Sequence, residues 1–415
     1  MHAVTFDVSV PRYLLAKSVG RVTESVLYGA LSGVKLVDRD PLPLPGPEWV
    51  RLEVILAGIC GTDIGNLSFS ASPAMEPFGS FPAVLGHEIL GRVTEVGAKA
   101  QVEVGQRVTV DPFVHCQVRG HAQSAWCGSC QSGLHATCEL AGEDGPTIID
   151  GQPFAPGTIQ GYHRSLPGGW SQEIIAHRSQ LFAVDEALDD RTAAVMEPLA
   201  IAMHAVLNTP ITDPGAPVMV LGSGPIALAT IWALRATGFQ GEIVGQIKRD
   251  HEAKIARALG ASDIVRPGDE ARQAIVDTGA SAYMPLVGDE VYAGGGFPLI
   301  FDCVGSRQTL SQSLRYASPR GRLVMLGCAA EIKKIDLTFV WARELEVKGF
   351  TGYGLESFRG QRRHTFDITH DLLVETGAPV EDLVTHVFPL VEVRQALSVA
   401  GNRRKWNSVK VLLQP

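Results

Sequence analysis

The chain has 415 residues, of which 45% are hydrophobic and 19% are charged, and its formal net charge is −8 at pH 7. This composition excludes a disordered chain, and the length predicts two domains. A negative chain without a long Lys/Arg run argues against nucleic acid as a partner, because phosphate binding needs a basic face. The N-terminus does not read as a signal peptide, and the uncharged stretch 214–234 has a Gly-Ser-Gly-Pro centre that would break a membrane helix. We therefore expect a cytoplasmic protein without a membrane span.

The first part of the chain predicts mainly β structure. Residues 13–29 form a predicted extra helix, to which the sequence assigns no role. Short apolar runs broken by Gly and Pro then predict the strands of a small antiparallel barrel or sandwich, at 34–38, 49–58, 91–97 and 106–110.

From about residue 216 strands alternate with helices. Predicted strands lie at 218–221, 242–247, 298–305 and 321–327, and predicted helices at 225–238 and 251–261. This alternation predicts a parallel, doubly wound sheet. The last segment, from about residue 355, contains a predicted helix at 367–377 and a closing strand at 408–413.

A glycine-rich turn follows the first strand of the alternating region. Its sequence matches GxGxxG/A and consists of Gly222, Ser223, Gly224, Pro225, Ile226 and Ala227. The first glycine permits the tight turn, and the second lets the backbone approach a pyrophosphate at the helix N-terminus. Such a turn alone also occurs in folds that bind nothing, but between a strand and a helix it predicts a dinucleotide cofactor.

The residues about twenty positions after this motif bear on the choice of cofactor, because an acidic residue there would mark NAD. Ile247 occupies this region and is followed by Lys248 and Arg249, with Asp250 placed past the strand end. The two cations could meet a 2′-phosphate, so we expect NADP rather than NAD. The alternative is that they form a solvated strand end.

Four of the seven cysteines are clustered with the spacing C-x10-C-x2-C-x7-C: Cys116, Cys127, Cys130 and Cys138. In a chain without an export signal, clustered thiols favour a metal over disulfides. Four thiolates suit a closed tetrahedral zinc, which leaves no room for substrate. A second group of ligand types is scattered along the chain, and each member alone is more often a packing residue: Cys60, His87, Glu88 and Glu197.

The chain resembles zinc-dependent medium-chain dehydrogenases, the relatives of alcohol, sorbitol and threonine dehydrogenases. The resemblance runs from Val34 to Leu413 and rests on the order and spacing of GICGTDIGN, VLGHEILGRVTEVG, GQRVTVDP, the cysteine cluster, MEPLA, VLGSGPIAL and SVKVLL. It implies an α/β fold in which a β-rich, GroES-like catalytic domain (1–205 and 355–415) surrounds an inserted Rossmann domain (206–354). It also implies two zinc ions per chain, with the structural zinc lobe at about 112–140, and a homodimer or homotetramer.

The resemblance implies an NAD(P)-dependent alcohol dehydrogenase that transfers hydride between a secondary alcohol or polyol and the cofactor. A catalytic zinc would polarise the substrate oxygen. Its expected ligands are Cys60, His87 and Glu197, and Glu88 would coordinate directly or exchange with substrate and water.

Further roles are implied around these ligands. Thr62 would hydrogen-bond the substrate alcohol and pass its proton outward, and Asp63 would orient the zinc-bound histidine. Lys410 would reach the cofactor pyrophosphate. The expected lining of the nicotinamide pocket is Cys303, Val304 and Leu326.

Two departures from the family pattern stand out. Gly65 replaces a histidine that ends the proton relay in many relatives, so the relay beyond Thr62 is undefined. Cys116 lies farther upstream than the usual two-residue spacing, and we expect residues 117–126 to loop out as an insertion. His115 and His121 are the substitutes if Cys116 is out of reach, but four cysteines are favoured.

Two other functions compete with this hypothesis. One is a zinc-free enoyl or quinone reductase of the same superfamily, and the other is a cofactor-binding relative that has lost catalysis. The intact scattered ligand set argues against the zinc-free reductase, and the intact ligands together with the intact glycine motif argue against the loss of catalysis.

Overall fold

The structure is a computed structural model that describes residues 1–20, 23–29, 31–327 and 331–415. The chain forms two compact units. Unit 1 comprises residues 1–197, 352–370 and 384–415, and unit 2 comprises residues 198–351 and 371–383. Two helices, α5 (Met196–Leu207) and α11 (Thr365–Thr376), each continue from one unit into the other.

The unit boundaries differ from the expected domain limits by several residues. The chain changes unit after residues 197 and 351, whereas the sequence placed these limits at 205 and 354. Residues 371–383 also belong to unit 2, where η6 (Val380–Leu383) contacts α6 (Pro225–Ala236). A contact of this kind between distant segments carries no local sequence signal.

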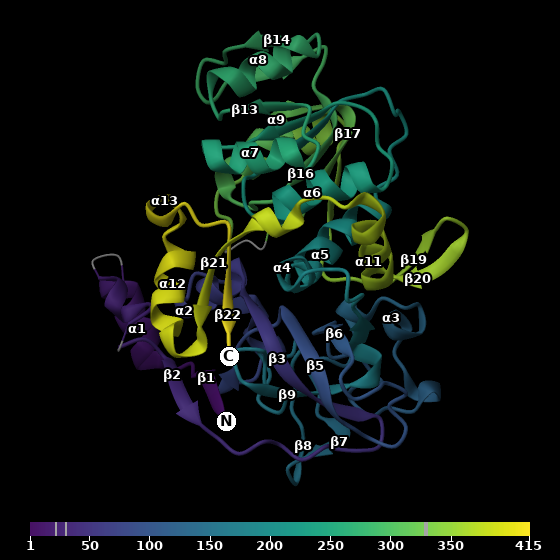
Figure 1. Cartoon of the computed structure of the whole chain (residues 1–415). Helices are drawn as coiled ribbons and strands as arrows, with labels where there is room; N and C mark the ends of the chain where they lie inside the picture. The colour runs from purple at the N-terminus through teal and green to yellow at the C-terminus, as the bar shows by residue number, and fades with distance from the viewer. Residues whose placement is uncertain (21–22, 30, 328–330) are drawn as a thin grey trace. The chain divides into compact units, whose positions relative to one another are not determined.

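A mainly antiparallel sheet is the framework of unit 1 (Figure 1). Its strands lie in the order β10 (Leu181–Ala183), β6 (Arg107–Val110), β5 (Ile89–Val96), β3 (Trp49–Ile59), β22 (Lys410–Gln414) and β21 (Val384–Pro389), and β9 (Glu173–His177) also pairs with β3. A smaller sheet has the order β2 (Val34–Asp38), β1 (His2–Phe6) and β4 (Ala83–Val84). The strands predicted at 34–38, 49–58, 91–97, 106–110 and 408–413 are all present. The C-terminal strand β22 pairs with β3, which brings the last residues of the chain into the same sheet as the first part.

The predicted helix at 13–29 is wrong in its limits. Helix α1 runs over Val10–Val19, and the short η1 (Glu24–Val26) follows it, while residues 21 and 22 lie outside the described part. The helix begins early because Pro11 sits in its first turn, where a missing N–H costs nothing. Sequence reasoning missed β1, a five-residue strand that pairs with β2 and β4.

The other elements of unit 1 are mostly short. They are α2 (Gly61–Leu67), η2 (Pro73–Phe78), η3 (Gln123–Ala125), α3 (Gly128–Gln131), η4 (His135–Thr137), β7 (Gly145–Ile149), β8 (Gln152–Phe154), η5 (Arg178–Gln180), α4 (Asp190–Ala194), β19 (Leu355–Phe358), β20 (Gln361–His364), η7 (Leu390–Glu392), α12 (Val393–Gly401) and α13 (Arg403–Trp406).

Unit 2 contains a six-stranded parallel sheet, as the alternation of strands and helices predicts. Its order is β13 (Asp263–Val265), β12 (Ile243–Gln246), β11 (Val218–Leu221), β16 (Phe297–Asp302), β17 (Ala317–Met325) and β18 (Glu346–Gly349). The first strand in sequence, β11, therefore lies between β12 and β16, and the chain reverses its direction of winding there. Ligands of doubly wound folds bind at the carboxyl ends of the strands at such a switch point.

The remaining elements of unit 2 connect these strands. They are α6, α7 (Asp250–Ala258), α8 (Asp269–Asp277), β14 (Ser281–Tyr283), β15 (Val291–Ala293), α9 (Arg307–Tyr316) and α10 (Thr338–Ala342). Helix α6 is apolar and buried along most of its length, and Pro225 occupies its first turn. Each unit has a hydrophobic core of its own, so each has its own packing energy.

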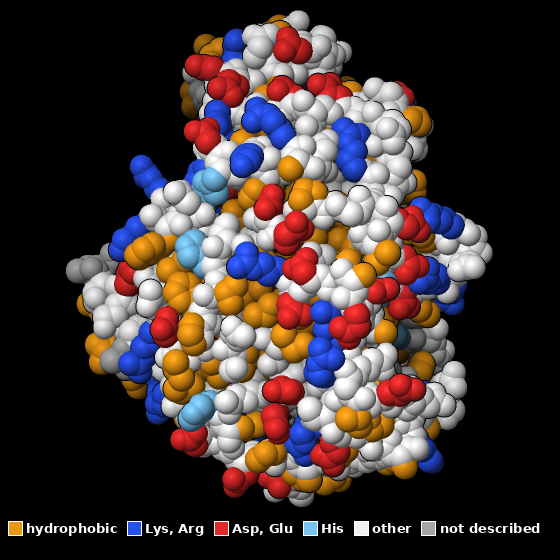
Figure 2. Space-filling view, in the orientation of Figure 1, with side chains coloured by type: hydrophobic (Ala, Val, Ile, Leu, Met, Phe, Trp, Pro, Cys, Tyr) orange, Lys and Arg blue, Asp and Glu red, His pale blue; other side chains and the backbone are white. Residues whose placement is uncertain are grey.

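On the face shown in Figure 2, acidic and basic side chains are intermingled rather than separated into patches. Among the described residues, no helix is both long enough and apolar enough to cross a membrane.

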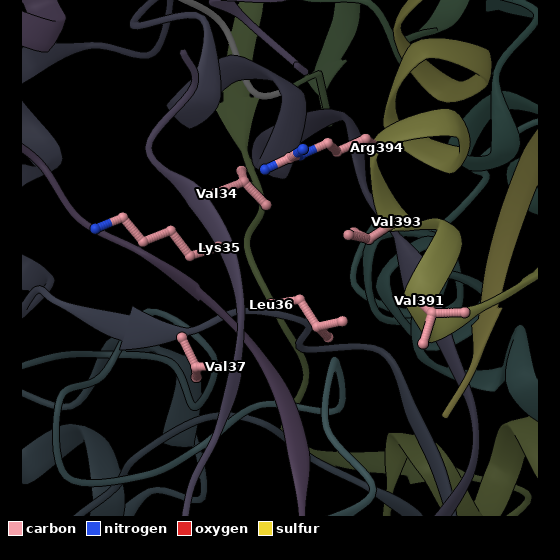
Figure 3. Close-up of a pocket in the computed structure, with 7 residues that line it drawn as sticks. All are labelled: Val34, Lys35, Leu36, Val37, Val391, Val393 and Arg394. Carbon is pink, nitrogen blue, oxygen red and sulfur yellow. The ribbon is translucent and has the colours of Figure 1, made fainter. Parts of the chain in front are cut away.

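A shallow groove of about 360 Å³ lies in unit 1 between β2 and the region of η7 and α12 (Figure 3). Its lining is Val34, Lys35, Leu36, Val37, Val391, Val393 and Arg394, and includes none of the predicted site residues.

Unit 1 also buries a neutral histidine, which makes its stability depend on pH. His163 is fully buried, and burial lowers the pKa of its imidazole to about 3 from the ordinary 6.5. Below pH 6.5 the His163 imidazole is therefore protonated in the unfolded chain but stays neutral in the folded chain. The free energy of unfolding falls as the pH drops from 6.5 toward 3. We expect His163 to contribute a slope of up to about 1.4 kcal/mol per pH unit in this window.

Urea unfolding between pH 7 and 4.5 measures this slope. The variant His163→Asn keeps an acceptor for the Ser165 amide, which bonds to His163 Nδ1 at 3.1 Å, but it does not titrate. It should show a shallower loss of stability with acid than the wild type. Parallel pH profiles for the two proteins would contradict the assignment.

Candidate catalytic and metal sites

The candidate catalytic site in unit 1 begins where β3 ends. Cys60 follows this strand and is the N-cap of α2, and the carboxylate of Asp63 accepts a hydrogen bond from the Cys60 amide at 2.7 Å. This cap fixes the first turn of the helix and the direction of the Cys60 side chain. The Thr62 hydroxyl lies 3.7 Å from the Cys60 sulfur. Thr62 is half-buried and Asp63 is fully buried.

His87 and Glu88 immediately precede β5, and their side chains lie close to the side chain of Cys60. Gly86 precedes them with φ of +95°, and a Cβ at this position would overlap the Trp170 ring, so only glycine fits. One ligand atom each from Cys60, His87 and Glu88 lies within 4.8 Å of the others. The structure therefore brings together three of the four residues of the scattered group as predicted.

Asp63 connects the histidine to a residue that sequence reasoning missed. Its Oδ1 lies 3.7 Å from His87 Nδ1 and accepts a 2.6 Å hydrogen bond from the Tyr162 hydroxyl. Burial lowers the pKa of His87, but the charges of Asp63 and Cys60 outweigh burial and raise it well above 6.5. His87 Nδ1 is buried without a hydrogen-bond partner, which leaves it directed toward Asp63. No sequence motif around Tyr162 predicts this hydrogen bond, because its two residues lie 99 positions apart in the chain.

Lys410 takes a different place from the expected one. Its Nζ donates to both oxygens of Glu88, at 2.6 and 2.7 Å, and both side chains are almost completely buried. Gly58 makes room for this pair, because a Cβ there would overlap the Glu88 carboxylate. Contact between Lys410 and a cofactor pyrophosphate stays a prediction, and it would require this ion pair to break.

Glu197, the fourth predicted ligand, lies outside the three-residue group. Its carboxylate accepts a hydrogen bond from the buried Tyr353 hydroxyl. Burial raises the pKa of Glu197 to about 7, and the nearby Glu88 charge acts in the same direction. A buried carboxylate of this kind is stabilised as an anion when a cation approaches.

These donors fit a zinc ion. A thiolate, an imidazole and carboxylates are the ligands of catalytic zinc sites, and three protein ligands leave a position for substrate. The fit rests on three observations: the close approach of the Cys60, His87 and Glu88 donors, the unpartnered ring nitrogen of His87 facing Asp63, and a second buried carboxylate at Glu197.

The four clustered cysteines also come together in unit 1. Their sulfurs lie within 4.8 Å of one another, with Cys116 at 3.7 Å from Cys127 and 3.8 Å from Cys138. Zinc–sulfur bonds of about 2.3 Å in a tetrahedron place sulfurs about 3.8 Å apart, so the cluster fits the ion closely. Amides of Cys127 and Glu139 point at sulfurs at 3.4 Å, and a hydrogen bond from Cys130 lowers the pKa of Cys138 to about 5. The thiol set fits Cys116 rather than His115 or His121.

The stretch 117–126 does not loop out as expected. Arg119 is fully buried and donates to the carbonyls of Val114, Ala141, Glu143 and Gly157. The Trp126 indole donates to the His121 carbonyl at 3.0 Å. The longer spacing thus provides a buried cation that satisfies several carbonyls beside the cysteines, which a mobile loop could not do.

The glycine-rich turn of unit 2 stands at the carboxyl end of β11. Gly222 has φ of +131°, and a Cβ there would lie 3.1 Å from Val304. Gly224 is the N-cap of α6, while Ser223, Pro225 and Ile226 are half-buried at the turn. The first-turn amides of α6 are therefore available for an anion such as a pyrophosphate.

The residues after β12 differ in exposure and pairing. Ile247 is buried and Lys248 is exposed, whereas Arg249 pairs with the buried Glu252 at 2.6 Å. Arg266 donates to the Ile247 carbonyl at 2.7 Å and pairs with Asp250. Lys248 is thus the predicted cation whose charge no described ion pair engages.

The predicted nicotinamide-pocket residues follow the next two strands. Cys303 and Val304 come after β16, and Leu326 comes after β17. The Leu326 amide bonds to the Asp302 carbonyl at 2.9 Å, which holds the two strand ends together. Cys303 also contacts the Thr230 hydroxyl on α6, with sulfur and oxygen 3.6 Å apart. All three residues therefore lie near the glycine turn of the same sheet edge.

Comparison with known proteins finds that the region of the candidate catalytic site and the region of the glycine turn each match a domain of the same family. Residues 46–186 match the alcohol dehydrogenase GroES-like domain, and residues 225–367 match the zinc-binding dehydrogenase domain. The chain belongs to the zinc-dependent medium-chain dehydrogenase family. The α/β fold with a GroES-like and a Rossmann part is confirmed, and so are the NAD(P)-dependent alcohol dehydrogenase class and its zinc dependence.

Relatives of this dehydrogenase share most of its length. It is 26% identical to an L-idonate 5-dehydrogenase of Vitis vinifera, over 92% of this chain and 93% of that one. It is also 26% identical to a sorbitol dehydrogenase of Arabidopsis thaliana, over 94% of this chain and 96% of that one. A solved structure of a zinc-binding dehydrogenase from Sinorhizobium meliloti, bound to NADP, aligns with a TM-score of 0.66 at 26% identity, over 100% of this chain and 99% of that one.

Replacement of Cys116 tests the thiol cluster of the dehydrogenase. We expect Cys116→Ser to lose one zinc equivalent and several kcal/mol of stability, because a structural zinc site contributes its binding energy to folding. The folded fraction should keep most of its kcat, since the cluster has no position for substrate. Metal analysis, thermal unfolding and activity per folded protein check these outcomes, and an unchanged zinc content would contradict the ligand assignment.

Proposed function

We propose that this dehydrogenase interconverts a secondary alcohol of a polyhydroxylated substrate and the corresponding ketone, with NADP as the coenzyme. The observation that carries the proposal is the convergence of the Cys60, His87 and Glu88 donors next to the Thr62 hydroxyl. The related L-idonate and sorbitol dehydrogenases support a polyol-type substrate.

We assign the catalytic zinc to Cys60, His87 and Glu88, with Glu197 as the further proposed ligand. When bound, the zinc and the nicotinamide supply polarisation of the substrate oxygen and a hydride acceptor. Thr62, whose hydroxyl lies beside the Cys60 sulfur, would hydrogen-bond the substrate hydroxyl and relay its proton, releasing its own hydroxyl proton to water or the cofactor ribose as it accepts the substrate's. Asp63 would hold the ring of His87 in one orientation and keep its proton on Nδ1.

Several finer features belong to the same proposal. A second zinc would be held by the four clustered cysteines, whose sulfurs are unlinked, as in a reducing compartment such as the cytoplasm. The functional domains would run over 1–205 with 355–415, and over 206–354. The assembly would be a homodimer or homotetramer.

The proposed coenzyme preference rests on the cations after β12. An exposed, unengaged lysine at 248 can reach a 2′-phosphate, whereas Arg249 would first have to leave Glu252. A charge-assisted hydrogen bond contributes about 1.5–3 kcal/mol, so we expect Lys248→Ala to raise the KM for NADP about tenfold or more and to leave the KM for NAD unchanged. Lys254→Ala, which removes an exposed lysine of the same helix region, is the matched control.

The decisive experiment is a coenzyme-linked assay with a panel of polyols, simple secondary alcohols and aldehydes, each with NAD and NADP. Turnover of polyols with NADP above NAD supports the proposal. Equal or better turnover with NAD rejects the coenzyme assignment. Reduction of enones or quinones by metal-depleted protein would instead favour the zinc-free reductase.

A further inference from the structure

A third group of metal-ligand side chains lies in unit 1 and has no part in the function described above. It consists of Asp111, His135 and His364, and one ligand atom of each lies within 4.8 Å of the others. Asp111 and His364 are buried and His135 is half-buried. Nothing in the sequence pattern joins these residues, which are separated by 24 and 229 positions (135 − 111 and 364 − 135).

The ligand atoms of this group lack hydrogen-bond partners. Asp111 Oδ2, His135 Nδ1 and His364 Nε2 are all buried and unpartnered, and so is Nδ1 of His115, whose ring stacks on His135 with centroids 4.2 Å apart. Unpaired buried polar atoms are costly and rare in folded proteins. Several in one cluster indicate a missing common partner.

Three separate segments bring these atoms together. Asp111 follows β6, His135 begins η4 in the cysteine-containing stretch 112–140, and His364 ends β20 of the β19–β20 hairpin. The Leu355 amide on β19 donates to the Gly133 carbonyl at 3.0 Å, and Arg362 donates to the Ser132 carbonyl. These bonds hold the hairpin against the segment that carries His135, and Figure 1 shows the hairpin as a separate projection from unit 1.

The remaining polar atoms of two members are anchored, which directs the unpartnered atoms toward one point. Asp111 Oδ1 accepts a bond from the Phe113 amide at 2.8 Å, and Oδ2 then faces His364 Nε2 at 3.4 Å. Phe182 stacks on the His364 ring with centroids 4.4 Å apart and fixes its plane. Ligands at about 2.0–2.1 Å from a tetrahedral ion lie about 3.3–3.4 Å apart, so this spacing fits a metal.

The charge of the buried Asp111 carboxylate also favours a bound cation. Asp111 is only 1% exposed, and no described Lys or Arg forms an ion pair with it. A buried carboxylate without a counter-charge is unfavourable, and a divalent cation would remove this cost. Two imidazoles and one carboxylate suit zinc and other first-row divalent metals.

One contact must change when a cation binds. The Phe366 amide donates to His364 Nδ1 at 3.3 Å, so that nitrogen carries no proton, whereas a metal on Nε2 moves the ring proton to Nδ1. Metal binding therefore costs this one long hydrogen bond of the buried Phe366 amide, about 1–3 kcal/mol, which the bonds from three ligands to the ion must exceed.

We propose that Asp111, His135 and His364 form a third metal site, which binds a first-row divalent cation and ties the β19–β20 hairpin to the cysteine-containing stretch. In a catalytic site the substrate can take the open coordination position of the ion. In this third site we expect water or His115 Nδ1 to take the fourth position. The site is separate from both ligand sets of the proposed function, and its role is structural.

Metal content tests this site. Wild-type protein and variants are saturated with Zn²⁺, desalted and analysed by plasma mass spectrometry together with protein concentration. We expect Asp111→Asn and His135→Gln each to hold one equivalent less than the wild type. The control His386→Gln, a half-buried histidine outside all three groups, should hold as much as the wild type.

The difference between wild type and variant decides, so the outcome does not depend on whether the catalytic site is filled. Cobalt substitution checks the fold, because the thiolate absorption of the cysteine cluster should be the same in wild type and His135→Gln. Equal zinc content in wild type and both variants overturns the proposal and leaves a metal-free contact between Asp111 Oδ2 and His364 Nε2. Should neither variant fold, the zinc content of Cys60→Ala decides, because this variant lacks the thiol of the catalytic set: two equivalents support a third site beside the cysteine cluster, and one or none overturns it.

Discussion

Replacing Lys410 with methionine is expected to destabilise the protein by about 3–5 kcal/mol, the cost of removing one partner from a buried ion pair. Lys410 Nζ lies 2.6 and 2.7 Å from the Glu88 oxygens, and both side chains are almost completely buried. Methionine fills a similar volume, so the loss reports the charge left on Glu88 rather than a cavity. Denaturant unfolding of metal-free protein measures the effect, with the exposed Lys405→Met as the matched control.

The double variant Glu88→Gln/Lys410→Met should recover much of this loss, because it buries no unpaired charge. Burial lowers the pKa of Lys410, but the Glu88 and Cys60 charges outweigh it and raise the pKa above 10.5. The stabilisation is therefore fully present below pH 10.5 and is lost as the pH rises through the folded-state pKa. Equal unfolding midpoints for Lys410→Met and wild type would mean that Lys410 is free, as contact with a cofactor pyrophosphate requires.

Replacing Cys60 with alanine is expected to remove one zinc equivalent and to lower kcat/KM at least about 10³-fold. A catalytic metal supplies several kcal/mol of transition-state stabilisation, and Cys60 is the single thiol of the proposed catalytic set. The side chain is small and only half-buried, so the fold should survive. Metal analysis and a steady-state coenzyme assay measure the two losses.

Thr62→Val separates metal binding from proton transfer. This variant should keep its full zinc content and the shape of the side chain, yet lose activity, because the hydroxyl beside the Cys60 sulfur is gone. A Cys60→Ala protein that retains wild-type turnover would reject the zinc assignment and favour a zinc-free reductase. Loss of activity in Cys60→Ala without loss of metal would place the ion elsewhere.

Local sequence signals predicted most of the larger elements of this protein, its glycine turn and its thiol cluster, whereas the roles of the scattered site residues came from the resemblance to the family. The apolar run 218–221, the glycine turn and the following helix predict β11, Gly222 and α6, because strand, turn and helix preferences act over a few residues. The cysteine spacing likewise predicted a thiol cluster, and the structure brings its four sulfurs together. The short strand β1 and the limits of α1 were less accessible, since brief segments carry little periodic signal.

Only the tertiary structure decided which distant side chains meet. The pairs Tyr162–Asp63, Lys410–Glu88 and Tyr353–Glu197 join residues up to 322 positions apart. They form because β22 pairs with β3 and because the return segment after residue 352 packs on unit 1. Hydrogen bonds and ion pairs of buried groups depend on distance in space, and a sequence motif records only distance along the chain. The same reason hid the cluster of Asp111, His135 and His364, three common residues that acquire metal-ligand geometry only when β6, η4 and β20 come together.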